Sequence, residues 1–246
     1  MNVYSALARY YDALTEDVPY EKWANRAEAL FDKFGRQPSI LLDLACGTGS
    51  LTKIFADRGY DVIAVDSSAE MLSAASEKIL ACEKRPLLLN QSMEALDLYG
   101  TVDGVICGLD SINYLASPEI LKAAFSRISL FLGRGGLFIF DINTEKKLRG
   151  LDMQVYTREA PGVFCVWQAQ WSPKERLCRF YIDLFERKED LYRRFSEVHT
   201  ERAYSICELS SVLSNCSMEI KAVYSELSDR DGSEDDDRVL IVAEKL

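Results

Sequence analysis

Three stretches of the chain carry side chains of the types that bind a small polar ligand. The first, Asp43-Leu44-Ala45-Cys46-Gly47-Thr48-Gly49, follows a short apolar run and forms a turn of small residues. Gly47 and Gly49 let the backbone approach a ligand closely, near a helix N-terminus whose free N–H groups favour negative charge. The second is Asp66, 17 residues after Gly49, where a carboxylate can accept both hydroxyls of a ribose. The third is Leu109-Asp110-Ser111-Ile112-Asn113-Tyr114, which follows a further apolar run.

The small-residue turn could hold several kinds of ligand, and its neighbours distinguish them. A triphosphate-binding loop needs a lysine directly after its last glycine, but Ser50 and Leu51 stand there. A dinucleotide-binding loop needs a small residue where this chain has Thr52. The carboxylate of Asp43 would repel a pyrophosphate and suits a ligand with an ammonium or hydroxyl group. The pattern therefore disfavours a nicotinamide-dependent oxidoreductase, which stays an alternative together with a non-catalytic binding module.

A predicted parallel sheet positions these side chains. From residue 39 to residue 141, short apolar runs alternate with helical patterns, which is typical of a doubly wound α/β fold. Ligands bind such sheets at the carboxyl ends of the strands. We predict strands at 40–44, 61–66, 86–90, 103–107 and 137–141, and helices at 51–58, at 67–81 with a capping box of Ser67 and Glu70, and from Ser117-Pro118-Glu119 to Gly133–Gly136.

Helices at the N-terminus and a β-rich segment add to this sheet. Residues 1–35 are predicted to form a helical cap, because Tyr4, Leu7, Tyr11 and Leu14 recur at helical spacing and a second helix runs from Tyr20 to Gly35. Residues 145–204 are predicted to form an inserted antiparallel meander, a lid or substrate wall. Its predicted strands are Val163–Trp171, Leu177–Glu186 and Leu191–Tyr204.

The α/β pattern resumes after the insertion. Ser205 and Glu208 form a capping box for a helix to about Asn215, and strands follow at 219–224 and 238–244. The predicted fold is therefore a Rossmann-like, mostly parallel seven-stranded sheet built from residues 1–144 and 205–246, interrupted by the meander.

Composition restricts the partners and the cellular compartment. The 246 residues carry a formal net charge of −10 with a pI near 4.8, a surface that repels nucleic acid. No apolar run approaches the roughly 20 residues of a membrane span, and the N-terminus lacks a signal-peptide pattern. We therefore expect a cytoplasmic protein that acts on a small molecule, without nucleic acid or membrane.

No metal site is predicted. The chain has one histidine, and its seven cysteines form no CxxC pair, which favours reduced cysteines in the core. The acidic run Asp229–Asp237 lacks the spacing of a calcium loop and is interpreted as a solvated loop.

The joint pattern resembles the class I S-adenosylmethionine-dependent methyltransferases. LLDLACGTG at 41–49 and AVD at 64–66 resemble the first two motifs of that family, and DSINYL and the closing VAEKL are also similar. The similarity is greatest to small-molecule methyltransferases with an N-terminal helical cap, and it is weakest across 145–200. Ala45 is a departure, because the family usually has glycine there.

The resemblance implies S-adenosylmethionine as the cofactor and suggests its contacts. Its methionine part would lie along Asp43, Ala45, Gly47 and Gly49, and its ribose would bind Asp66. The adenine would contact Ser67, Met71 and Gln91-Ser92-Met93. Leu109 and Asp110 would close the site after the fourth strand. The cofactor carboxylate would be covered by Tyr11, Tyr20 and Trp23, with Arg26 as a counter-ion.

The predicted reaction is methyl transfer to a nucleophile. The sulfonium already activates the methyl group, so the protein mainly supplies alignment and desolvation, and no catalytic residue is assigned. His199, between Glu197 and Glu201, could act as a general base because histidines titrate near neutrality, although a structural or surface role is favoured. The aromatic residues of the insertion (Trp167, Trp171, Tyr181, Phe185) would shape an acceptor pocket or their own small core. The same sheet could also form a homodimer.

Overall fold

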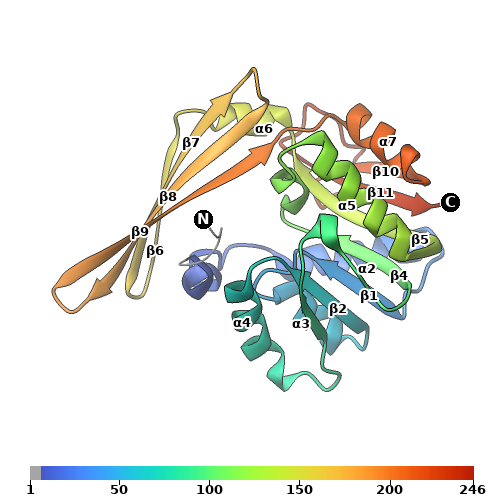
Figure 1. Ribbon diagram of the computed structural model, residues 1–246, viewed down its shortest axis with the longest axis horizontal. Helices are drawn as coiled ribbons and strands as arrows, with labels where there is room; N and C mark the ends of the chain where they lie inside the picture. Colours follow the sequence, from blue (N-terminus) through green and yellow to red (C-terminus); the bar gives the residue numbers. More distant parts are fainter. Residues whose placement is uncertain (1–6) are drawn as a thin grey trace.

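The computed structural model describes residues 7–246, which form two β-sheets (Figure 1). Tyr4, which is predicted to lie on the first N-terminal helix, is outside the described residues. Within residues 7–246, no helix combines the length and the apolar character needed to cross a membrane. All seven cysteines are free thiols, and five of them are buried, as expected of reduced core residues: Cys82, Cys107, Cys165, Cys178 and Cys216.

The larger sheet confirms the predicted doubly wound architecture. Its strand order is β10-β11-β5-β4-β1-β2-β3, with β10 and β11 antiparallel to their neighbours and the rest parallel. The chain reverses its direction of winding between β1 and β4, so a crevice opens at their carboxyl ends. The strands are β1 (Ile40–Leu44), β2 (Asp61–Asp66), β3 (Leu87–Asn90), β4 (Val102–Cys107), β5 (Leu132–Asn143), β10 (Met218–Ser225) and β11 (Arg238–Lys245).

Helices cover both faces of this sheet. On one face, α2 (Tyr20–Lys33) and α3 (Ser50–Asp57) pack apolar side chains against β1, β4 and β5. On the other, α5 (Pro118–Phe131) and α7 (Ile206–Asn215) bury a cluster that includes Phe138 and Phe140. The remaining elements are α4 (Ala69–Lys78), which packs beside β2 and β3, and the short 3₁₀ turns η2 (Ile79–Ala81), η3 (Met93–Ala95) and η4 (Ser111–Tyr114).

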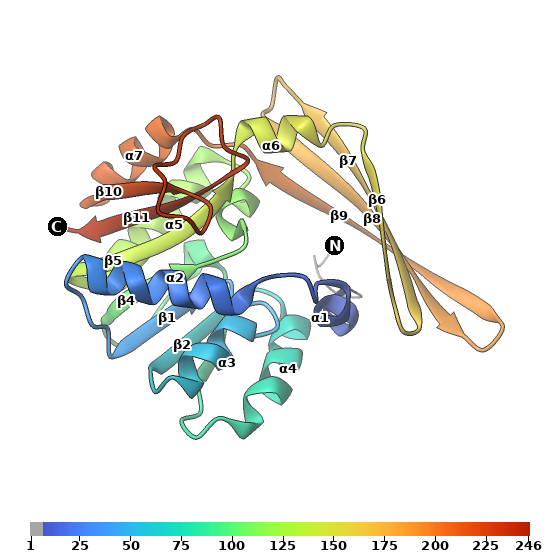
Figure 2. The same ribbon diagram turned by 180° about the vertical axis from the view of Figure 1, so that it is seen from behind.

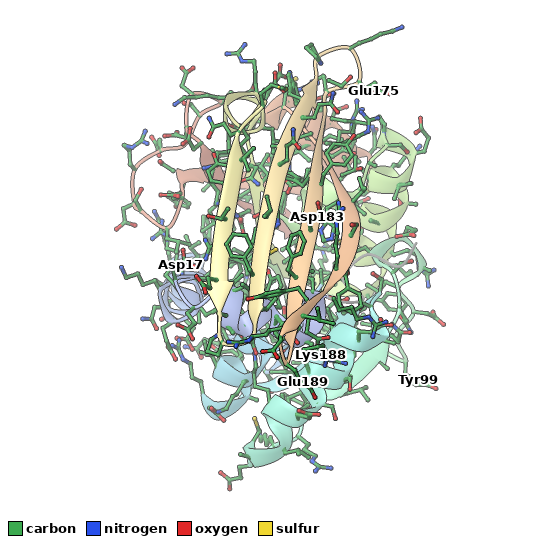
Figure 3. All side chains as sticks on the ribbon, turned by 90° about the vertical axis from the view of Figure 1, so that its left-hand side faces the viewer. Asp17, Tyr99, Glu175, Asp183, Lys188 and Glu189 are labelled. Carbon is green, nitrogen blue, oxygen red and sulfur yellow. The ribbon has the colours of Figure 1, made fainter. Side chains whose placement is uncertain are left out.

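The smaller sheet is an antiparallel meander in the order β6-β7-β8-β9. It stands to one side of the α/β unit (Figures 1 and 2). Side chains alternate across it, so Ile182 and Leu184 of β8 are buried on the inner face while Asp183 points outward in Figure 3. Its strands are β6 (Val155–Ala160), β7 (Val163–Ser172), β8 (Leu177–Lys188) and β9 (Leu191–Arg202).

Two short helical turns at the N-terminus lie between the sheets (Figures 1 and 2). These are η1 (Leu7–Tyr10) and α1 (Tyr11–Leu14), and their Leu7 and Leu14 are buried against β7 and β8. On the opposite side Asp12 accepts a hydrogen bond from Thr48 Oγ1 at 2.6 Å and pairs with Lys78 at 2.8 Å. This segment therefore connects the smaller sheet to the glycine loop.

The meander has one more strand than predicted. β6 is an edge strand whose side chains are exposed on both faces. Its sequence VYTREA therefore lacks the alternation of apolar and polar residues that would have predicted a strand. The six-residue α6 (Glu145–Gly150) was also missed, since Leu148 is its one buried side chain. The other three strands lie where the alternation places them.

Two boundaries of the α/β unit also differ. Ser68, not Ser67, caps α4, and its hydroxyl accepts the Met71 N–H at 3.2 Å, so the predicted capping box of Ser67 and Glu70 is wrong. β5 begins at Leu132 rather than 137, because Gly133–Gly136 bulge out opposite the interval between Val102 and Gly104 on β4. The capping box of Ser205 and Glu208 is confirmed.

Candidate active site

The glycine loop after β1 turns through left-handed backbone. Ala45, Gly47 and Gly49 have φ angles of +59°, +55° and +76°. At Gly49 the turn also needs space, because a Cβ atom there would lie 2.9 Å from Ala75 Cβ. Ala45 adopts the left-handed turn despite its side chain, which costs on the order of 1 kcal/mol relative to glycine. The loop thus keeps the predicted conformation at the position that departs from the family.

Asp43 lies buried at the end of β1 and faces this loop. Its side chain accepts a hydrogen bond from Thr52 Oγ1 at 2.5 Å. Burial raises the pKa of Asp43 to about 7, against the lowering effect of the Thr52 hydroxyl. Thr52, which breaks the dinucleotide pattern, therefore serves as the donor to this carboxyl group.

Asp66 fixes the loop to the end of β2. One carboxylate oxygen accepts the Gly47 N–H and the other accepts the Ser68 N–H, both at 2.8 Å. Burial raises the pKa of Asp66, and these two backbone donors act in the opposite direction. Each oxygen keeps a free lone pair that can accept a further hydrogen bond.

These elements surround a cleft at the carboxyl ends of β1, β2 and β4. Its lining includes most of the predicted cofactor contacts, namely Tyr11, Tyr20, Asp43, Ala45, Gly47, Asp66, Ser67, Met71, Met93 and Leu109. It also includes seven residues to which the sequence assigned no cofactor contact: Cys46, Thr48, Ser50, Leu51, Gly108, Ser111 and Tyr114. Cys46, Thr48, Ser111 and Tyr114 belong to the first and third stretches singled out in the sequence, and Ser50-Leu51 and Gly108 adjoin those stretches, which was the available indication.

Comparison with known proteins identifies the family. Residues 41–136 match the model of a methyltransferase domain. A crystal structure of an S-adenosylmethionine-dependent methyltransferase from Clostridium acetobutylicum ATCC 824 superposes with a TM-score of 0.87, at 32% identity over 99% of both chains. The chain is a class I S-adenosylmethionine-dependent methyltransferase. Its cofactor is therefore S-adenosylmethionine, as the two motifs predicted.

Two further relatives extend this comparison. The methyltransferase is 28% identical to the "Putative methyltransferase YqeM" of Bacillus subtilis (strain 168), over 99% of this chain and 97% of the relative. Its fold also matches the S-adenosylmethionine-bound amino pentose methyltransferase CalS10 of Micromonospora echinaspora, with a TM-score of 0.76 and 21% identity over 100% and 99% of the two chains. At that identity the second likeness concerns the fold.

Some predicted contacts of the methyltransferase lie outside the cleft lining. Trp23 is buried, and its Nε1–H donates to Asp141 at 3.1 Å. Gln91 pairs with the backbone of Asp97 instead of facing the cleft. Arg26 pairs with Asp229 of the acidic loop at 2.6 Å. The other residues outside the lining are Gly49, which caps α3, Ser92, which caps η3, and Asp110, which faces a second cavity.

Asp141 holds the loop after β4, a role that sequence analysis missed. Leu109 and Asp110 have φ angles of +58° and +53°, an uncommon conformation outside glycine. The buried carboxylate of Asp141 accepts their N–H groups at 2.7 and 3.0 Å and also pairs with Arg238. Asp141 ends the apolar run predicted as a strand at 137–141, and a carboxylate at the end of such a run was the available indication.

A second cavity of the methyltransferase lies between the two sheets. Apolar side chains of the smaller sheet, including Trp167, Phe180 and Ile182, face Asp110 and Arg238 of the larger one. The cavity shares Tyr11, Leu109 and Tyr114 with the cleft, so the two are adjacent. Of the aromatic residues named for the insertion, only Trp167 lines this cavity; the others pack in a small core (Trp171) or face outward (Tyr181, Phe185).

Proposed function

We propose that this methyltransferase transfers the methyl group to a small molecule bound in the cavity between the sheets. The observation that carries the proposal is that the cleft and the cavity meet at Tyr11, Leu109 and Tyr114. In this arrangement the meander of residues 145–204 is the wall of the acceptor site. Likeness to an amino pentose methyltransferase and the net charge of −10 support a small acceptor over a nucleic acid.

The side chains that line the cleft fit S-adenosylmethionine. The free lone pairs of Asp66 suit the two ribose hydroxyls, and the carboxyl group of Asp43 suits the ammonium of the methionine part. Met71 and Met93 offer apolar surface to the adenine beside Ser67. Tyr20 and Ser50 line the end of the cleft near the N-terminal segment.

The protein contributes alignment and exclusion of water to the reaction. S-adenosylmethionine supplies a methyl group already activated by its sulfonium sulfur. Asp141 fixes the backbone of Leu109, so the junction of the two sites is rigid. Tyr11, on a helical turn packed between the sheets, covers the same junction. An acceptor held there is desolvated by the apolar side chains of the meander.

Binding of S-adenosylhomocysteine tests the cofactor site. Asp66→Ala is expected to weaken that binding by well over tenfold in calorimetry, because it removes the acceptor of two hydroxyls. Asp61→Ala is the matched control: Asp61 is exposed at the other end of β2 and should leave the affinity unchanged. Equal affinities of both variants would remove Asp66 from the ribose role.

Turnover tests the acceptor site. Phe180→Trp, which narrows the cavity between the sheets, should leave S-adenosylhomocysteine binding unchanged but abolish methylation of a small-molecule acceptor. If S-adenosylhomocysteine does not bind at high micromolar concentration, the cofactor site is wrong. If it binds but the enzyme methylates RNA and no small molecule, the proposed acceptor class is wrong.

A further inference from the structure

A chain of hydrogen bonds runs from buried Glu197 through His199, in the lining of the second cavity, to Tyr114, which lines both the cavity and the cleft. The Tyr114 hydroxyl lies 3.1 Å from His199 Nδ1, and His199 Nε2 lies 3.0 Å from Glu197 Oε2. His199 and Glu197 are buried on the inner face of β9. Tyr114 lines both the cleft and the cavity, so this residue lies at the junction of the proposed cofactor and acceptor sites.

The carboxylate partner at Nε2 selects the tautomer of His199 when the imidazole is neutral. A carboxylate only accepts, so the proton of neutral His199 is on Nε2 and is donated to Glu197. Nδ1 is then unprotonated and accepts the Tyr114 O–H. A proton taken up at the Tyr114 oxygen can therefore pass on to His199, whose imidazolium form the Glu197 carboxylate stabilises.

The charges around the cavity favour a positively charged acceptor. Its two guanidinium groups are already paired, Arg158 with Asp17 at 2.9 Å and Arg238 with Asp110 at 2.5 Å. Glu201 is buried in the same wall, and within residues 7–246 it has no ion pair; Asn143 Nδ2 donates to it at 3.0 Å. Burial and the charge of Asp110 raise the pKa of Glu201 to about 8, while Asn143 and the charge of Arg238 act in the opposite direction. An ammonium would compensate this buried carboxylate.

We propose that the methyl acceptor is an amine, recognised as its ammonium by Glu201 and deprotonated by Tyr114 with His199 and Glu197 behind it. This inference rests on the proposed function. An N–H bond of the ammonium breaks, its proton goes to the Tyr114 oxygen, and the phenolic proton of Tyr114 goes to His199 Nδ1. The electron pair left on nitrogen forms the new N–C bond as the C–S bond breaks, with its pair going to sulfur. The positive charge moves from sulfur to nitrogen. The carboxylate of Glu201 in the cavity wall stabilises this charge, whereas it would oppose the oxyanion needed for methylation of a hydroxyl.

Recognition of the ammonium is tested by binding. Calorimetry on the S-adenosylhomocysteine complex at pH 8.5 compares benzylamine with its neutral and anionic analogues, benzyl alcohol and benzoate. We expect at least tenfold tighter binding of benzylamine, and loss of this preference in Glu201→Gln. Glu186→Gln is the control, because Glu186 is buried on the same sheet outside the cavity and accepts from Tyr10 at 2.5 Å. No preference for the amine would overturn the proposal, whereas failure of S-adenosylhomocysteine to bind would overturn the proposed function.

The proton path is tested by nitrogen NMR of the one histidine in the chain. Labelling with ¹⁵N-histidine reports His199 alone, and we expect the Nε2–H form in the cofactor-product complex. The Nδ1–H form would contradict the path, since Nδ1 could not then accept a proton from Tyr114. Tyr114→Phe should change the Nδ1 shift, and an Nδ1 shift equal to that of the wild type would contradict the hydrogen bond between Tyr114 and His199.

Catalysis by the path is tested with the amines that bind. The charged and titratable groups around His199 are Tyr114 from η4, Glu197 and Glu201 from its own strand, and, from the rest of the cavity lining, Tyr11 of α1, Asp110, Arg158 and Arg238. His199→Gln should lower kcat about 100-fold at pH 7.5, and the loss should shrink toward pH 9.5 as solvent deprotonates the amine. An equal loss at both pH values would assign His199 a structural role, and amines that bind without being methylated would overturn the proposal.

Discussion

At the scale of single residues, the chemistry of the cleft depends on buried carboxyl groups with few donors. Asp43 has Thr52 as a side-chain donor and is 1% exposed, so its charged form is unfavourable in the ligand-free protein. The pKa of Asp43 of about 7 means that this group is largely protonated at pH 6 and largely ionised at pH 8. A ligand ammonium would bind the ionised form.

The affinity for S-adenosylhomocysteine should therefore depend on pH through Asp43. Because the carboxyl must lose its proton to pair with the ammonium, affinity should rise about tenfold from pH 6 to pH 8. Calorimetry at both pH values checks this. Asp43→Asn should bind more weakly than wild type at pH 8 and show a flat profile. A variant that keeps the wild-type profile would assign the dependence to another group.

Ala45 is the residue whose conformation can be improved. Its φ of +59° is unfavourable for any residue with a Cβ atom. Ala45→Gly should leave stability unchanged or raise it by up to about 1 kcal/mol, as relief of the turn competes with the greater freedom of glycine in the unfolded chain. Urea unfolding measures the change. Ala56→Gly, in helix α3, is the control and should lose about 1 kcal/mol; an equal loss at Ala45 would contradict the argument.

Sequence alone predicted the residues of the cleft that belong to local loops. Asp43 and Asp66 were recognisable because a carboxylate at the end of a buried strand is seldom left without a partner. Trp23, Gln91 and Arg26 do not line the cleft, because their partners are set by the tertiary structure. The partner of Trp23, for example, is Asp141, 118 residues away.

At the scale of elements, regular patterns were predictable and irregular ones were not. The strands of the larger sheet are short continuous apolar runs, and apolar and polar residues alternate along β7, β8 and β9. Both patterns predict strands, so these strands were expected from the sequence. β6 has neither pattern, because neither of its faces is buried. The loop after β4 is the irregular element with the greatest consequence, since its position depends on Asp141 rather than on its own sequence.

Asp141→Asn should destabilise the protein by about 2–4 kcal/mol. The carboxylate accepts from two backbone N–H groups, from the Trp23 indole and from the Arg238 guanidinium group. The amide has only one acceptor oxygen, so some of these buried donors lose their partner. Urea unfolding checks this. Asp183→Asn is the matched control on the outer face of the smaller sheet (Figure 3), where its partner Arg194 is exposed, and it should lose less than about 1 kcal/mol. Equal losses would show that the carboxylate of Asp141 is not needed to hold the loop.

At the scale of the whole molecule, the N-terminal segment connects the two sheets. The helical spacing in residues 1–35 predicts a cap on the α/β domain. In the structure Leu7 and Leu14 pack on the smaller sheet, while Asp12 accepts a hydrogen bond from Thr48 of the glycine loop. The spacing could not reveal this double attachment, because it shows which face of a helix is apolar but not what that face meets. The assignment of separate domains, a cytoplasmic location and a homodimer stay predictions.

This double attachment predicts that a mutation on the smaller sheet's side weakens cofactor binding. Leu14→Ala should destabilise the protein by about 2–5 kcal/mol and also weaken S-adenosylhomocysteine binding at least threefold, because α1 carries Tyr11 of the cleft and Asp12 of the loop contact. Calorimetry at a temperature where the variant is folded measures the affinity. Leu213→Ala is the control: Leu213 is equally buried, but on α7, on the face of the larger sheet opposite α2 and α3. It should lose similar stability and keep wild-type affinity, so equal weakening in both variants would mean that affinity follows overall stability rather than the position of the N-terminal segment.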